Sequence, residues 1–218
     1  GGGGRIAVHC ANCSSSLLTA RLLPDGARWE TLTLSAGGGA GGAALTKPGD
    51  AGWSRHAVGR GGPGTIFGAA AGERALLLSN PTAVAGVDSE VRIGDGQFGL
   101  TSVDAIALHA CVVEITHTLN VKSFVSVQAI VTQKQNVYVR GTVDITSGNW
   151  TMTSSYNLEA ASMLVGAEAA ISTNDASQLR LKADALEVAG SVSARDVHVE
   201  AGELRLVGDG AIDADGLG

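Results

Sequence analysis

Short apolar triplets recur along this chain at nearly constant offsets. The triplet at residues 106–108 is followed after 19 residues by the triplet at 125–127, and after another 18 by the triplet at 143–145. In each triplet the apolar residues are the first and the third, as in a strand that turns one face inward. Short strands that recur about every 20 residues are typical of a solenoid.

Two further pairs of triplets repeat the same offset. Residues 179–181 and 197–199 lie 18 residues apart, as do residues 186–188 and 204–206. The chain is therefore predicted to be all-β, with a right-handed parallel β-helix of coils near 20 residues over residues 84–216. In such a solenoid the inward side chains of successive coils stack in ladders, and the strand hydrogen bonds run between coils.

Other folds with short strands fit the pattern less well. A leucine-rich repeat has a similar period, but its Leu/Asn consensus is missing. An antiparallel sandwich or barrel would give many strands but no repeated offset between like triplets. The one helix-like stretch, residues 158–171, is interrupted by Gly166 and has a poorly defined apolar face, which argues against a helix.

Glycine divides the chain into two parts. Of the 31 glycines, 18 lie in residues 1–75, and all four prolines precede residue 82. Glycine clusters suit tight corners and close backbone approach, so residues 1–80 are predicted to form glycine-rich coils with long loops that decorate the solenoid. Residues 81–218 are predicted to form regular coils continuous with the first part. Both ends are interpreted as cuts through a longer polypeptide, with a processed mature protein as the alternative.

The composition excludes several classes of partner. A net charge of −6 with scattered Lys and Arg gives no electrostatic footprint for nucleic acid, and it disfavours an anionic membrane surface. No apolar run approaches the length of a membrane span. Aromatic residues make up only 4% of the chain, so small aliphatic side chains are expected to fill a narrow interior.

The three cysteines leave three interpretations open. Cys10 and Cys13 form a Cys-x-x-Cys pair, and Cys111 lies far along the chain. A zinc site needs a second pair of ligands, and a redox motif needs a βαβ setting. Secretion would favour a disulfide, and buried reduced thiols are the alternative. With three cysteines, one is left over or is bridged outside this sequence.

Two sequons predict N-linked glycans. Asn12-Cys13-Ser14 and Asn149-Trp150-Thr151 fit the acceptor pattern, so Asn149 and Asn12 are the predicted sites. Asn80 is excluded by the proline that follows it. Two sequons in a chain of this kind indicate a secreted protein.

No catalytic, metal or cofactor site is predicted. Asp213 and Asp215 lie at i and i+2, on one face of an extended segment, where paired acids could bind calcium or act as acid and base. They occupy a glycine-rich turn with no basic residue nearby in sequence, so a solvated turn is expected. The histidines show no metal-ligand spacing, and His198, between Val197 and Val199, should face solvent.

Three segments carry a resemblance to a known family. They are GGGGRIAV at residues 1–8, GGPGTIF at 61–67 and ALLLSN at 75–80. Together they resemble a repeat in very large, glycine-rich extracellular proteins of algae and other protists, of the surface-fibre or flagellar-hair (mastigoneme) type. The resemblance covers residues 1–80 well and residues 208–218 moderately. It implies a pectin-lyase-like right-handed coil and a place in surface fibres, adhesins or flagellar hairs.

The predicted function is structural. The chain is expected to be a non-enzymatic module of a secreted fibrous or cell-surface protein, a rigid rod within an extracellular filament or coat. Its partners would be other copies or other filament subunits, and it should polymerise end to end because uncapped strand edges pair with other chains.

A carbohydrate-binding adhesin is the alternative function. It needs an exposed aromatic platform, for which the candidate residues are Trp29, Trp53 and Trp150. A polysaccharide lyase or hydrolase is a further alternative, and it would need a groove of acidic residues with Arg or Lys.

Overall fold

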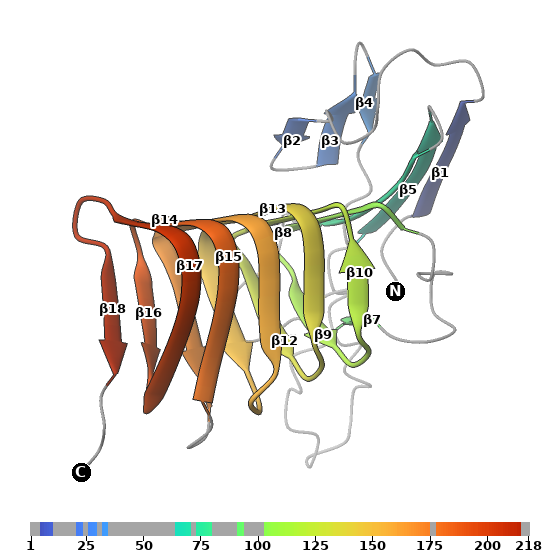
Figure 1. Ribbon diagram of the computed structural model, residues 1–218. Helices are drawn as coiled ribbons and strands as arrows, with labels where there is room; N and C mark the ends of the chain where they lie inside the picture. Colours follow the sequence, from blue (N-terminus) through green and yellow to red (C-terminus); the bar gives the residue numbers. More distant parts are fainter. Residues whose placement is uncertain are drawn as a thin grey trace, which may run out of the picture.

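The computed structural model is all-β, and its strands stack as a parallel β-solenoid of roughly six turns (Figure 1). This confirms the predicted fold class. The described residues are 5–10, 21–23, 26–29, 32–34, 64–70, 73–79, 91–93, 103–174 and 178–214, and for those before residue 73 only the backbone is described.

Each coil has three faces, named here in the order in which the chain passes through them. Face 1 contains β10 (Leu119–Val121) and the first segments of β13 (Val137–Met152), β14 (Asn157–Thr173), β15 (Gln178–Val188) and β17 (Asp196–Leu206). Face 2 contains β6 (Glu73–Ser79), β8 (Ala105–His109), β11 (Ser123–Val127) and the following segments of β13, β14, β15 and β17. Face 3 contains β7 (Val91–Ile93), β9 (Val112–Ile115), β12 (Ala129–Gln133), the last segments of β13 and β14, β16 (Ser191–Ala194) and β18 (Ala211–Ala214).

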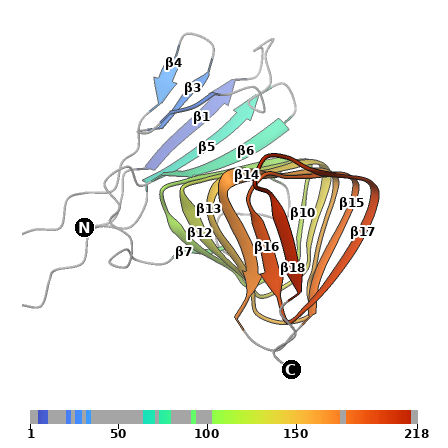
Figure 2. The ribbon, with the colours of Figure 1, turned by 90° about the vertical axis from the view of Figure 1, so that its left-hand side faces the viewer.

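The coil is right-handed. Figure 2 looks onto the C-terminal end of the stack, where the chain rises through β17, crosses the top and descends through β18. The chain therefore turns counter-clockwise while it advances toward the viewer.

The core is a set of apolar ladders along the axis of the stack. On face 2 one ladder has seven rungs in continuous register, and all but the last are at most 2% exposed. Its members are Leu76, Ile106, Phe124, Val143, Met163, Leu186 and Leu204. The predicted offsets of 18 residues from Leu179 to Val197 and from Leu186 to Leu204 are both confirmed.

The predicted register of residues 125–127 is wrong by one residue. Phe124 pairs with Ile106 and with Val143, so the inward residues of β11 are Phe124 and Ser126, which are 0% and 1% exposed. Residues 124, 125 and 127 are all apolar, so alternation alone could not decide the face, and a one-residue slip exchanges the two faces. The Phe124 ring decides it by packing edge-on against Trp150, with centroids 5.0 Å apart.

Glycine is required at one of the turns between faces 2 and 3. Gly148 has a φ of 100°, and a Cβ there would collide with the Ala129 carbonyl oxygen of the preceding coil. In the two preceding coils, Ala110 and Gln128 adopt a positive φ at this turn. Residues 158–171 lie within the extended β14, as the interruption at Gly166 predicted.

The strands before residue 73 are arranged differently from the coils. β5 (Gly64–Ala70) runs antiparallel to β6, and β1 (Arg5–Cys10) runs parallel to β5, so both extend the face-2 sheet. They bend away from the stack in Figure 1. β2 (Arg21–Leu23), β3 (Gly26–Trp29) and β4 (Leu32–Leu34) form a separate antiparallel sheet. The domain division at residue 80 stays a prediction.

Candidate functional site

The outer side of face 1 is hollowed along the solenoid axis. Two hollows of about 520 Å³ each adjoin there, and both are lined by Glu159, Lys182 and Glu200. We call the pair the face-1 groove. Its other polar and charged lining residues are Tyr138, Arg140, Asn157, Gln178, Arg180, Asp184 and His198.

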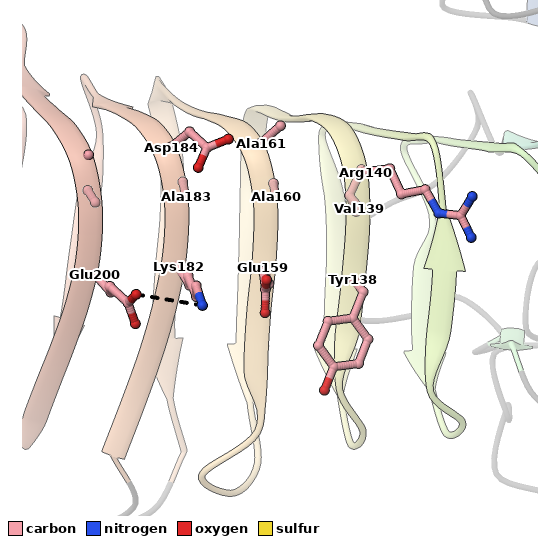
Figure 3. Close-up of a pocket in the computed structure, with 12 residues that line it drawn as sticks. Tyr138, Val139, Arg140, Glu159, Ala160, Ala161, Lys182, Ala183, Asp184 and Glu200 are labelled. Carbon is pink, nitrogen blue, oxygen red and sulfur yellow. Dashed lines mark ion pairs between the residues drawn. The ribbon is translucent and has the colours of Figure 1, made fainter.

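The groove side chains line up because the strands of face 1 are in register. Tyr138 pairs with Glu159, Glu159 with Lys182, and Lys182 with Glu200, so the four form one outward ladder. Figure 3 shows them projecting from successive strands toward the same side. The adjacent inward ladder is made of Val139 and the small residues Ala160, Ala183 and Ala201. Successive rungs are separated by about 4.8 Å, the spacing between paired strands.

The groove carries both signs of charge. Lys182 Nζ lies 3.6 Å from Glu200 Oε1, and both side chains are more than half exposed. Arg180 Nε donates a hydrogen bond to Gln178 Oε1 at 2.6 Å, and Gln178 Nε2 donates to Asp196 Oδ2 at 3.0 Å. Exposed pairs of this kind contribute little to stability and exchange readily with water. The groove therefore suits a hydroxyl-rich ligand better than a polymer of uniform charge.

The carboxylates of the ladder are separated from each other by a cation. Lys182 stands between Glu159 and Glu200, so each carboxylate has an ammonium group on the neighbouring strand. A glycosidase pair instead holds two carboxyl groups across one bond. In the part of the chain that the structure describes, no group of three His, Cys, Asp or Glu side chains could hold a metal ion.

The Asn149 sequon lies on the outer side of face 3. Asn149 is exposed and Thr151 is half-buried on the same side of β13, while Trp150 between them points into the core. The acceptor amide is therefore accessible, and its glycosylation stays a prediction. Asn12 lies outside the described residues.

The cysteine interpretations also stay open. Cys111 is buried, and its Sγ lies 3.8 Å from the Leu78 carbonyl oxygen. The side chain of Cys10 and all of Cys13 lie outside the described residues.

Trp150 is excluded as an aromatic platform because it is fully buried. Its Nε1 donates to Gln133 Oε1 at 2.8 Å, and Gln133 Nε2 donates to the backbone carbonyls of Gln135 and Asn157. The Trp29 side chain and Trp53 lie outside the described residues.

Other sequence-predicted residues fall in different places. His198 is exposed, as predicted, and lies in the groove. Asp213 is exposed as expected, but it lies within β18 and pairs with Ser193, so it is not in the expected turn. Asp215 lies outside the described part. Tyr138, the aromatic residue of the groove, was not identified from the sequence, because it precedes its partner Glu159 by 21 residues and not by the 18 or 19 of the predicted repeat.

Two ionic clusters on the coils were also missed. Glu114, with a side chain 4% exposed, forms ion pairs with Arg92, at 2.8 Å, and with Lys134. Asp104 accepts a hydrogen bond from the Arg74 backbone N–H at 2.9 Å and pairs with Lys122 at 3.2 Å. Partial burial raises the pKa of Asp104, but these contacts outweigh it and hold the pKa below its usual value. The partners of both carboxylates come from neighbouring coils, so each cluster links adjacent coils of the solenoid.

Comparisons of the chain with protein-family models, with curated proteins and with solved structures found no match. No helix of the described residues is long and apolar enough to cross a membrane.

Proposed function

We propose that this chain is a rigid structural module of an extracellular filament or coat. The observation that carries the proposal is the seven-rung ladder from Leu76 to Leu204, which runs unbroken through every coil of face 2. A stack with one continuous close-packed core resists bending, because bending would open gaps between side chains. Its backbone hydrogen bonds run between coils, along the rod axis. The hydrogen bonds of all three faces therefore resist a pulling force along the rod.

The extracellular location is supported by two observations. The Asn149 side chain is exposed on the outer side of face 3, so the acceptor amide is accessible. The glycine-rich segments at residues 1–8 and 61–67 resemble those of protist surface fibres. The partners we propose are further copies or other subunits of the filament, and we assign no catalytic role.

Localisation in the native source tests this proposal. An antibody raised against residues 103–214 should label surface filaments or a cell coat in electron micrographs, and antibody pre-absorbed with the protein should not. The native protein should lose mass on treatment with an N-glycosidase. Intracellular labelling together with an unmodified Asn149 would overturn the proposal.

The face-1 groove favours a second function, the binding of an extended neutral glycan. Tyr138 offers a ring, and Glu159, Lys182 and Glu200 offer acceptors and donors along the groove. Calorimetry with neutral oligosaccharides should detect binding that Tyr138→Ala and Lys182→Ala both weaken. Glu168→Ala, at an exposed position on face 3, is the matched control. Release of shorter sugars during the titration would instead indicate a hydrolase or lyase.

A further inference from the structure

We propose that one hollow of the face-1 groove binds an extended β-1,4-linked glycan along the rod axis, with one sugar on each coil. This hollow is lined by residues 138–140, 159–161, 182–184 and 200–202, and we call it the corner hollow. The inference rests on the glycan-binding function proposed above for the groove. It adds the linkage, the direction and the length of the ligand, which that function leaves undefined.

The corner hollow lies between two rows of side chains that follow the rod axis. One row is the outward ladder of Tyr138, Glu159, Lys182 and Glu200. The other row lies where the chain passes from face 1 to face 2, and it consists of Arg140, Ala161, Asp184 and Gly202. Between the rows lie the small or short residues Val139, Ala160, Ala183 and Ala201. Figure 3 shows the labelled members of the three rows, strand after strand.

The walls of the hollow repeat from coil to coil. Each of β13, β14, β15 and β17 contributes three consecutive residues, so equivalent positions recur at the strand spacing of about 4.8 Å. A β-1,4-linked chain of glucose or mannose lengthens by nearly the same distance per sugar, because both of its bonds to each ring are equatorial and keep the chain straight. An α-1,4-linked chain coils and advances less per sugar. The spacing therefore favours the straight chain.

The four coils define four sugar positions. The first and the last strand of the hollow are three strand spacings apart, which is about 14 Å. A longer glycan would extend past the lining residues at both ends and gain no further contacts within the hollow.

The polar groups of the corner hollow suit uncharged hydroxyl groups. Three carboxylates and two cations line it, so neither a polyanion nor a polycation meets a uniform opposite charge. They are Glu159, Asp184, Glu200, Arg140 and Lys182. Lys182 Nζ and Glu200 Oε1 are 3.6 Å apart on side chains that are more than half exposed, so sugar hydroxyls can replace this weak pairing. Tyr138 is half-buried in the first strand of the hollow and offers a ring on which a sugar can stack.

Calorimetry on the 218-residue chain tests the length and the linkage. The probes are β-1,4-linked glucose and mannose oligomers of two to six sugars. In at least one series we expect the affinity to rise about fivefold per added sugar, the effect of roughly one net hydrogen bond, up to four sugars and then to level off. α-1,4-linked glucose oligomers of the same lengths should show no such rise.

Two substitutions test the position of the ligand. Tyr138→Ala removes the first sugar position, so the rise should stop at three sugars, whereas Tyr138→Phe keeps the ring and should retain the rise to four. Ala161→Trp fills the middle of the hollow and should abolish binding. Ala170→Trp, the same exchange in β14 but at the position paired with Asn149 on the outer side of face 3, is the matched control and should bind normally. Circular dichroism of each variant shows whether the fold is retained.

The outcomes separate this inference from the function on which it rests. An affinity that keeps rising past four sugars, equal binding of α-linked chains, or normal binding by Ala161→Trp would overturn the arrangement of one sugar per coil and leave glycan binding in place. Absence of binding by every oligomer would remove both. The structural role is tested by localisation in the native source and does not depend on either result.

Discussion

At the scale of single residues, the coil depends on backbone positions and partly buried charges that tolerate little change. Gly148 stands at a turn where the conformation and the preceding coil both exclude a side chain. Asp104 has its charged form stabilised by groups from neighbouring coils. Each of these residues connects one coil to another, so substitutions there test the stacking directly.

Gly148→Ala should destabilise the protein by roughly 2–3 kcal/mol, because a strained backbone and a collision with the Ala129 carbonyl coincide. Gly208→Ala is the matched control, since Gly208 also has a positive φ, 61°, but no atom lies within 4 Å of an added Cβ. The control should cost only about 1 kcal/mol. Urea unfolding measures the free energy of unfolding of both variants. Equal losses would show that the preceding coil moves to accommodate the added Cβ at position 148 without a loss of stability.

The stability contributed by Asp104 should depend on pH. Its pKa is held below the usual value in the folded chain, so the contribution is present above the unfolded pKa of about 3.9. It is lost as the pH falls through the folded pKa, because the folded carboxylate then takes up a proton. The difference in unfolding free energy between the wild type and Asp104→Asn should therefore shrink below about pH 4.

At the scale of the element, each strand is defined by which of its sides faces inward. In β11 the inward side carries Phe124 and Ser126, and Val125 faces outward, half-buried. In β12 the inward Gln133 is tolerated because its amide group bonds to the Trp150 indole and to two backbone carbonyls. Polar residues thus occur inside the coil where other strands supply their partners.

The register of β11 is tested by two substitutions at adjacent positions. Phe124→Ala should cost roughly 3–5 kcal/mol, because it removes a fully buried ring and leaves a cavity. Val125→Ala should cost about 1 kcal/mol or less, because its side chain is half-buried on the outer side. Thermal unfolding measures both losses. A larger loss of stability for Val125→Ala than for Phe124→Ala would instead support the register in which Val125 faces inward.

At the scale of the whole molecule, each coil contacts only its neighbours, so stability should be lowest at an uncovered end. Backbone amides of β17 and β18 should exchange hydrogen faster than those of β13 and β14 in dilute protein. Mass spectrometry of peptic peptides measures the exchange. Equal protection of β17 and β13 would mean that another part of the chain covers β17.

The sequence by itself determined the fold class, the repeat length and the faces of β15 and β17. Those strands alternate apolar and charged residues, as in Leu179-Arg180-Leu181, so burial of one side leaves a single choice. The exposure of His198 followed from the same alternation.

Only the tertiary structure decided features that depend on neighbouring coils. The face of β11 required the Trp150 ring beside Phe124, because the strand is apolar on both sides. The face-1 groove required the register of four strands, since Tyr138, Glu159, Lys182 and Glu200 are spaced unevenly along the chain. The antiparallel β5 beside β6 carries no repeat signal. Sequence periodicity records which side of a strand is buried, whereas register and edges depend on which strand lies beside it.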